Sequence, residues 1–408
     1  MSAHYSIRSN DTEFAYRQES NFYYISGICE DHCVIVLDET EQKSYLFVKE
    51  ISEQERLWVG SRMGISGAKA RHAFDEVYDI ETFAQQMQEL LKERARLYCD
   101  LFGNDPLLDT LRLTCKKLLD ARGVLRSPRT FSDVFELTQK MRLIKSEEEI
   151  AQIRKALAIT QEAHHRAMHL CREGMNEYEI EAEIEYVFSK NGADHNAYSS
   201  IVAGGNNANV LHYVQNRDTL KSGELLLIDA GCEYNMYASD ITRTFPVSGV
   251  FTAAQRELYE MVLQVQLEII AMIRPGGCKK ILQEASERLL CEGMVRLGIL
   301  KGNVDTLLES KVHKKYYPHG IGHWLGLDVH DPCPYVNEAG KQIIFEAGMV
   351  MTIEPGVYVQ ADDQEVPERF RGIGIRIEDN ILVTNEGYEN LSNGIAKTIS
   401  EIEAMCQS

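Results

Sequence analysis

Two aspartates on either side of an expected turn have the type and spacing of metal ligands. Asp229 ends an apolar run, and Asp240 follows the stretch AGCEYNMYAS, a pattern typical of a β-hairpin. If the turn centres on Tyr234 and Asn235, the two carboxylates stand directly opposite each other on neighbouring strands. Like charges in that position repel, and a divalent cation between them would remove the repulsion. Two solvated aspartates at the protein surface are the alternative interpretation.

More candidate ligands follow in the last hundred residues. Glu354 ends the apolar run Met349–Ile353, and Glu378 lies in GIRIEDNILV, where strand alternation places it on the same face as Arg376. The glycine-rich segment PHGIGHWLGLDVHD lies before both acids, and its three histidines are His319, His323 and His330. One such histidine would usually be structural. Three of them beside repeated strand acids predict a catalytic site.

The charge of these groups indicates which ions the site would hold. Four carboxylates are nearly neutralised by two divalent cations. Carboxylate ligands with a single imidazole suit manganese, cobalt or iron better than a structural zinc ion. Two such ions about 3.5–4 Å apart can lower the pKa of a bridging water, polarise a carbonyl group and hold an amino group. This is the chemistry of amide hydrolysis.

An internal repeat explains how distant acids could meet. The stretch GELLLIDAG (223–231) recurs as GMVMTIEPG (348–356), so that Asp229 and Glu354 occupy equivalent positions. Each copy follows two helical patterns, which are Ile150–Cys171 with Glu177–Lys190 and Ala253–Ile273 with Lys280–Leu297. The repeat predicts two α/β halves that face each other across a pseudo-two-fold axis, with the two acids at its centre.

A smaller α/β unit precedes the repeat. Cys33–Leu37 and Tyr45–Val48 are predicted strands, Phe83–Tyr98 has helical periodicity, and the stretch around Leu97–Phe102 favours another strand.

A new helix then begins at Ser146, which forms a capping-box pattern with Glu149. We therefore expect an N-terminal domain over residues 1–145 and a catalytic domain over residues 146–408.

Composition bounds the class of protein. The 408 residues, 44% of them apolar, can form two cores. A net charge of −19 disfavours nucleic acid and anionic membranes as partners. No apolar stretch approaches a membrane span, no secretory signal opens the chain, and the ten cysteines include no Cys-x-x-Cys pair. We expect a cytoplasmic protein with reduced thiols.

Four runs together carry a specific resemblance. LLLIDAGCEYNMYASDITRTFPV, HGIGHWLGLDVHD, MVMTIEPGVYV and RGIGIRIEDNILVT are similar to those of aminopeptidase P, the Xaa-Pro aminopeptidase family of "pita-bread" metallopeptidases, and the likeness extends to RSNDTEFAYRQESNFYYISG. The resemblance implies a duplicated pita-bread catalytic domain behind a smaller α/β domain, usually with two Mn²⁺ ions. It implies release of the N-terminal residue from peptides with proline in second position, by attack of a metal-bridging hydroxide on the Xaa-Pro bond.

Carried over position by position, the resemblance assigns roles to individual residues. The implied metal ligands are Asp229, Asp240, His323, Glu354 and Glu378, with Asp240 and Glu378 bridging. Glu354 would also move the proton of the attacking water. The implied catalytic groups around them are His212, His319, His330 and Arg376. Asp11 and Trp58 match positions that complete the substrate pocket, with Trp58 reaching a neighbouring subunit, so we expect a homo-oligomer, either a dimer or a tetramer.

Other readings of the same motifs stay open. The dipeptide-specific Xaa-Pro dipeptidases (prolidases) share all five ligands. A non-catalytic binding protein with this fold would have lost ligands, and creatine-type amidinohydrolases lack the metal set. The chain also starts almost at RSNDTEF, where relatives usually carry a further helix and strand, so we expect a shortened N-terminal domain.

Overall fold

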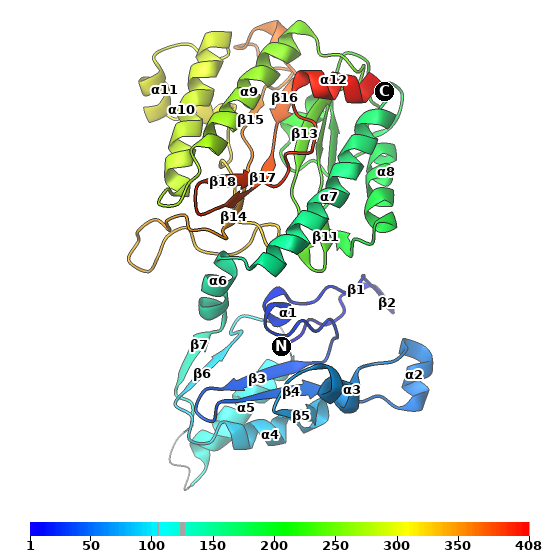
Figure 1. Cartoon of the computed structure of the whole chain (residues 1–408), viewed down its shortest axis with the longest axis vertical. Helices are drawn as coiled ribbons and strands as arrows, with labels where there is room; N and C mark the ends of the chain where they lie inside the picture. Colours follow the sequence, from blue (N-terminus) through cyan, green and yellow to red (C-terminus); the bar gives the residue numbers. More distant parts are fainter. Residues whose placement is uncertain (104–105, 123–126, 408) are drawn as a thin grey trace. The chain divides into compact units, whose positions relative to one another are not determined.

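The protein consists of two compact units. The structure is a computed structural model that describes residues 1–103, 106–122 and 127–407 (Figure 1). The units span Met1–Gln139 and Lys140–Ser408. Both combine helices with strands, so the mixed α/β class expected from the sequence is confirmed. The domain boundary at residue 145 stays a prediction.

The first unit is built on a three-stranded sheet. Its helices and strands are β1 Ile7–Ser9, β2 Thr12–Glu13, α1 Ser20–Ser26, β3 Val34–Asp38, β4 Lys43–Val48, α2 Glu53–Val59, α3 Gly64–Arg71, β5 Glu76–Asp79, η1 Ile80–Thr82, α4 Phe83–Leu90, β6 Arg96–Cys99, α5 Pro106–Asp120 and β7 Thr130–Asp133. The sheet order is β3-β4-β5. Side chains alternate along β4: Tyr45 and Phe47 pack in the core with residues of α4 and α5, and Leu46 and Val48 pack with residues of α1 and α3.

The predicted helix over Phe83–Tyr98 is wrong in its second half. Helix α4 ends at Leu90, and the strand β6 occupies Arg96–Cys99. Glu93 adopts a left-handed backbone with φ 61°, which the right-handed helix cannot continue through. The nearby prediction of a strand around Leu97–Phe102 agrees with β6 in part.

The second unit contains the repeat. Its helices and strands, with α6 crossing from the first unit, are α6 Phe135–Leu143, α7 Glu147–Leu170, α8 Glu177–Lys190, β8 His195–Asn196, β9 Ile201–Gly204, η2 Gly205–Asn209, β10 Leu225–Asp229, β11 Cys232–Tyr234, β12 Tyr237–Ala238, β13 Thr242–Pro246, α9 Ala253–Ala271, α10 Lys279–Leu297, α11 Val304–Glu309, η3 Val312–Lys315, β14 Val350–Ile353, β15 Gly356–Tyr358, η4 Glu368–Phe370, β16 Gly374–Arg376, β17 Asp379–Val383, β18 Tyr388–Asn390 and α12 Ile399–Gln407. Its strands lie between the pair α7 and α8 and the pair α9 and α10 (Figure 1).

The order of elements matches the predicted duplication. Helices α7 and α8 precede β10, which ends at Asp229, and helices α9 and α10 precede β14, which Glu354 follows directly. The capping box of Ser146 and Glu149 starts α7, as the sequence indicated, and Thr252 starts α9 with a box of the same kind. The repeat therefore places an acid at the end of an equivalent strand in each half.

The predicted hairpin register is wrong, because the turn lies one residue later in the chain than expected. The turn consists of Asn235 and Met236, which both have positive φ, and not of Tyr234 and Asn235. As a result Asp229 pairs with Thr242, and Asp240 lies outside the strands. A two-residue turn with two positive φ angles matches the strand twist, and asparagine tolerates that conformation well.

The structure also bears on two expectations from the sequence, reduced cysteines and no membrane-spanning segment. None of the ten cysteines, all of which are among the described residues, forms a disulfide. Over the residues the structure describes, no helix is both long enough and apolar enough to cross a membrane.

A buried ionic network ties the start of the second unit to the histidine-bearing segment. The Asp331 carboxylate accepts hydrogen bonds from Arg142 and, at 2.9 Å, from the Lys145 ammonium. All three side chains are at most 2% exposed. Burial raises the pKa of Asp331, but Lys145 and Arg142 outweigh it and the pKa is lowered. The stabilisation from this lowered pKa is therefore present at neutral pH and is lost as the pH falls through the folded-state pKa.

Removing the shared carboxylate should destabilise the second unit strongly. We expect Asp331→Ala to lower its free energy of unfolding by about 3–5 kcal/mol, because the buried Lys145 ammonium loses its carboxylate and Arg142 loses one of its two. Urea unfolding followed by Trp324 fluorescence in a Trp58→Phe background measures this. Lys140→Met is the matched control, because its partner Glu338 is exposed. Equal unfolding midpoints for the two variants would contradict the expectation.

Candidate metal centre and active site

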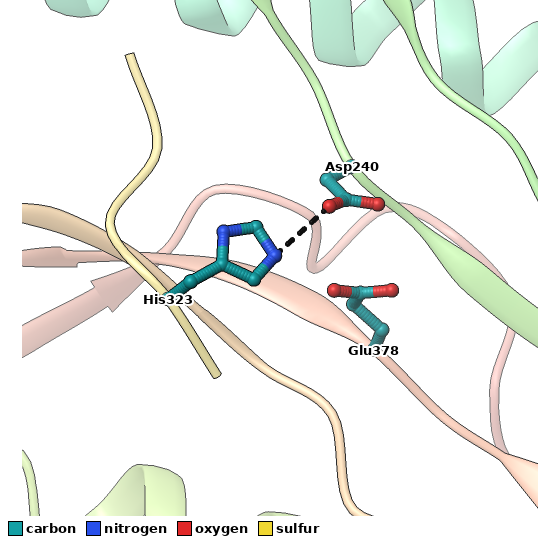
Figure 2. Close-up of side chains that lie close together, drawn as sticks. All are labelled: Asp240, His323 and Glu378. Carbon is teal, nitrogen blue, oxygen red and sulfur yellow. Dashed lines mark ion pairs between the residues drawn. The ribbon is translucent and has the colours of Figure 1, made fainter. Parts of the chain in front are cut away.

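Three of the expected ligands form a compact group. One donor atom from each of Asp240, His323 and Glu378 lies within 4.8 Å of the others (Figure 2). The His323 Nε2 atom is 3.2 Å from the Asp240 Oδ2 atom. Asp240 follows β12, His323 belongs to the segment before β14, and Glu378 lies between β16 and β17. Residues far apart in the chain therefore converge on one point.

The other two acids join the same cluster. The Glu354 Oε1 atom is 3.7 Å from His323 Nε2. Asp229 is linked to Asp240 by the hydroxyl of Tyr198, which lies 2.6 Å from an oxygen of each carboxylate. A phenol has one proton and cannot donate to both acids at once. The second close contact therefore requires a proton or a cation on that carboxyl group.

The electrostatics of the cluster show the same crowding. Burial raises the pKa of Asp240 and of Glu378, and neighbouring carboxylates raise both further. Burial likewise raises the pKa of Glu354, which reaches about 7. Burial lowers the pKa of His323, but the hydrogen bond to Asp240 outweighs this effect and raises the pKa to about 9. The acids thus compete for positive charge, which divalent cations would supply.

The donor geometry of His323 fits a bound cation. Its Nδ1 atom lies 3.0 Å from the Trp324 carbonyl oxygen. Because a carbonyl only accepts, Nδ1 carries a hydrogen in either protonation state of the ring, and Nε2, once it gives up its own hydrogen, can present its lone pair to a cation. This is the arrangement that orients a metal-binding imidazole. With the carboxylate oxygens, it provides the hard donors that divalent ions such as manganese prefer.

Arg376 holds two of the acids, one directly and one through a hydroxyl group. Its guanidinium donates to Asp229 at 2.6 Å, to the Tyr358 hydroxyl at 2.9 Å and to the Thr242 hydroxyl at 3.0 Å. Thr242 in turn donates to Glu378 at 2.7 Å. Arg376 is 4% exposed. One fixed cation thus orients acids from both halves of the repeat.

The remaining predicted histidines differ in their surroundings. His319 is largely buried, with Nε2 2.8 Å from the Tyr358 hydroxyl and Nδ1 3.6 Å from Glu354 Oε2. His330 is exposed, and its ring lies against His323 with a centroid separation of 4.1 Å. His212 is also exposed and lowers the pKa of His330, though less than burial and the charge of His323 do. His330 and His212 are therefore accessible to solvent, whereas His319 is largely enclosed.

Asp11 and Trp58 belong to the first unit. Asp11 is exposed between β1 and β2, and Trp58 in α2 is 85% exposed. Their assignment to the substrate pocket stays a prediction.

Sequence reasoning missed the hydroxyl groups that connect the acids. Tyr198, Thr242 and Tyr358 each contact two of the charged or histidine side chains of the site. Tyr198 precedes the strand β9, and nothing in its spacing sets it apart from other tyrosines. Thr242 gave a usable signal, because it follows Asp240 by two positions and the ladder pairs it with Asp229.

Comparison with known proteins places the chain in a family. The family model of aminopeptidase P, N-terminal domain, matches residues 1–98, and that of metallopeptidase family M24 matches residues 151–385. The chain belongs to metallopeptidase family M24. The resemblance seen in the sequence motifs, including its two-part organisation, is therefore confirmed.

Individual members of family M24 match over nearly the whole chain. The Xaa-Pro aminopeptidase of Escherichia coli (strain K12) is 43% identical over 411 residues, which cover 98% of this chain and 90% of the relative. Xaa-Pro aminopeptidase 3 of Homo sapiens is 36% identical over 98% of this chain and 78% of its own length. The structure of Zn-substituted E. coli aminopeptidase P in complex with product matches with a TM-score of 0.95 and 42% identity, covering 100% of this chain and 92% of that one.

The Tyr198 hydroxyl should matter for metal affinity. We expect Tyr198→Phe to weaken binding of Mn²⁺ by about 10- to 100-fold, because the hydroxyl that contacts and orients Asp229 and Asp240 is lost. Calorimetric titration of the metal-free protein measures the affinity. Tyr237→Phe is the control, since that hydroxyl donates to Glu149 at 3.0 Å. Unchanged affinity in Tyr198→Phe would show that this hydroxyl does not orient the ligands.

Proposed function

We propose that this chain is an Xaa-Pro aminopeptidase, a hydrolase that releases the N-terminal residue from peptides with proline in second position. The observation that carries the proposal is the convergence of four acids and one histidine on a single cluster in a member of family M24. Relatives named Xaa-Pro aminopeptidase match over 98% of the chain. The complete set of candidate ligands argues against a non-catalytic binding protein.

The cofactor we propose is a pair of divalent ions, with Mn²⁺ as the physiological metal. Asp229, Asp240, His323, Glu354 and Glu378 would hold them, with Asp240 and Glu378 shared between the two. The hard oxygen donors and the single imidazole support this choice. When bound, two such ions lower the pKa of a water and polarise the scissile carbonyl.

The chain's own residues supply the remaining steps. Glu354 accepts the proton of the attacking water and passes it on to the leaving proline nitrogen. His319, His330 and His212 hold the substrate and stabilise the charge that develops on the carbonyl oxygen. Arg376 keeps the acids in place through its hydrogen bonds to Asp229 and Thr242.

The finer assignments concern the setting of the enzyme. We propose that it acts in the cytoplasm on free peptides and forms a homo-oligomer, a dimer or a tetramer. Asp11 and Trp58 would complete the substrate pocket, with Trp58 reaching a neighbouring subunit. The 85% exposure of Trp58 supports that role, since a large apolar side chain gains from burial against a partner. We also propose 1–145 and 146–408 as the domain bounds.

A dipeptidase is the second candidate function, and substrate length separates the two. We expect hydrolysis of Ala-Pro-Ala-Ala to alanine and Pro-Ala-Ala, at a higher kcat/KM than hydrolysis of Ala-Pro. Chelation should abolish both activities, because the crowded acids cannot perform the chemistry without cations, and Mn²⁺ should restore them. Activity on Ala-Pro alone would favour the dipeptidase. Full activity in metal-free protein would overturn the metallopeptidase proposal.

Two neighbouring histidines should respond differently to truncation. His330→Ala should keep two bound metal ions and lower kcat by about 10²- to 10³-fold, since only a charge-stabilising group is lost. His323→Ala should lose metal as well as activity, because a ligand is removed. Metal content measured beside kcat distinguishes the roles, and each variant serves as the folding control of the other. Equal metal loss in both would refute this division.

A further inference from the structure

A lysine beside the cluster has no role in the chemistry proposed above. Lys279 is the first residue of α10, and its ammonium lies 3.9 Å from the centroid of the Tyr335 ring. The Tyr335 hydroxyl accepts a hydrogen bond from the backbone N–H of Trp324, the residue after His323. A cation–π contact of this kind fixes the ammonium over a ring that is itself anchored to the histidine segment.

Lys279 also lies close to the other end of the same segment. A Cβ atom placed on Gly320, the residue after His319, would be 3.9 Å from the Lys279 Nζ atom. Burial lowers the pKa of Lys279, and the nearby charge of Glu354 opposes that shift. The ammonium is therefore close to Gly320, which follows His319, and to the ring of Tyr335, and it is within electrostatic reach of Glu354.

The ammonium of Lys279 has no acidic partner within the part of the chain that the structure describes. Among the described residues, no carboxylate oxygen lies within 4.0 Å of its Nζ atom. The next residue provides a contrast, because Lys280 is exposed and pairs with Glu284 at 3.7 Å on the same helix. A half-buried ammonium with only an aromatic face beside it has unused hydrogen-bonding capacity, and an anion would satisfy it.

We propose that Lys279 binds a carboxylate of the peptide substrate and thereby selects peptides with a negative charge close to the cleaved bond. The inference rests on the proposed peptidase function and adds a substrate class to it. The substrate's own α-ammonium is repelled by Lys279, so the partner is a group on the other side of the bond. Two sources share this chemistry: the C-terminal carboxylate of a short peptide and an acidic side chain after the proline.

Three matched peptides test the proposal and separate the sources. Ala-Pro-Ala has a free C-terminal carboxylate, Ala-Pro-Ala-amide has none, and Ala-Pro-Glu-amide has only a side-chain carboxylate. We expect the wild-type enzyme to prefer at least one of the two acids over the neutral amide by about tenfold in kcat/KM, the effect of one charged hydrogen bond. High salt should reduce this preference. Whichever acid is preferred identifies the source of the carboxylate.

Variants at two adjacent lysines give the decisive comparison. Lys279→Met should bring the acid-to-amide ratio close to one, and Lys279→Arg should retain most of it because the charge remains. Lys280→Met should leave all three rates unchanged. If the wild-type enzyme shows no preference for an acid over the amide, Lys279 does not bind a substrate carboxylate. The same conclusion follows if Lys279→Met lowers the rates on acid and amide equally. If wild type cleaves none of the three peptides, the proposed peptidase function fails and this inference fails with it.

Discussion

Repulsion among carboxylates is the constraint on which the rest of the molecule depends. The largely buried acids of the cluster are Asp229, Asp240, Glu354 and Glu378. Burial alone opposes ionisation of such groups, and each neighbouring charge opposes it further. Within the described residues, the basic side chains in direct contact with these acids are Arg376, which is always charged, and the histidines His319 and His323, of which His319 stays neutral because burial lowers its pKa to about 3. Fixed protein charge therefore leaves the cluster negative, and that deficit is what gives it affinity for divalent cations.

The duplicated fold supplies the rigidity that this repulsion demands. In each half, one acid stands at the end of an interior strand: Asp229 ends β10, and Glu354 follows β14 directly. The second acid of the later half is Glu378, and a buried ionic network holds its backbone. Arg243, which is fully buried, donates to the Glu378 carbonyl oxygen at 2.6 Å and to the Asp379 carboxylate at 2.7 Å. Lys397 also donates to Asp379, at 2.5 Å. Two buried cations and one carboxylate thus fix the backbone of Glu378, so the acids cannot relieve their repulsion by moving apart.

The sequence predicted the elements well and their fine register poorly. Helices α7 to α10 were recognisable because capping residues and apolar periodicity are local signals, and the strand acids were recognisable because the repeat marks them twice. The hairpin register depended on which residue shares the two-residue turn with Asn235, either Tyr234 or Met236. Shifting the turn by one residue changes every cross-strand pair, and the sequence did not distinguish the two positions. Contacts through Tyr198 could not be predicted, since they join residues that are distant in the sequence. The family resemblance supplied the ligand set, which charge and spacing alone had left open.

Stability and catalysis meet in the same interaction. A cluster of like charges lowers the stability of the folded chain, and such strain persists at functional sites because the surrounding structure over-determines it. A cation that binds the folded state and not the unfolded chain returns stability in proportion to the logarithm of its concentration over its dissociation constant. The ions proposed to activate the water would therefore also relieve the strain in the fold. The bound ions would compensate the negative charge of the acids, so the acids can stay ionised in the folded enzyme. The same ions are the ones that the proposed reaction needs.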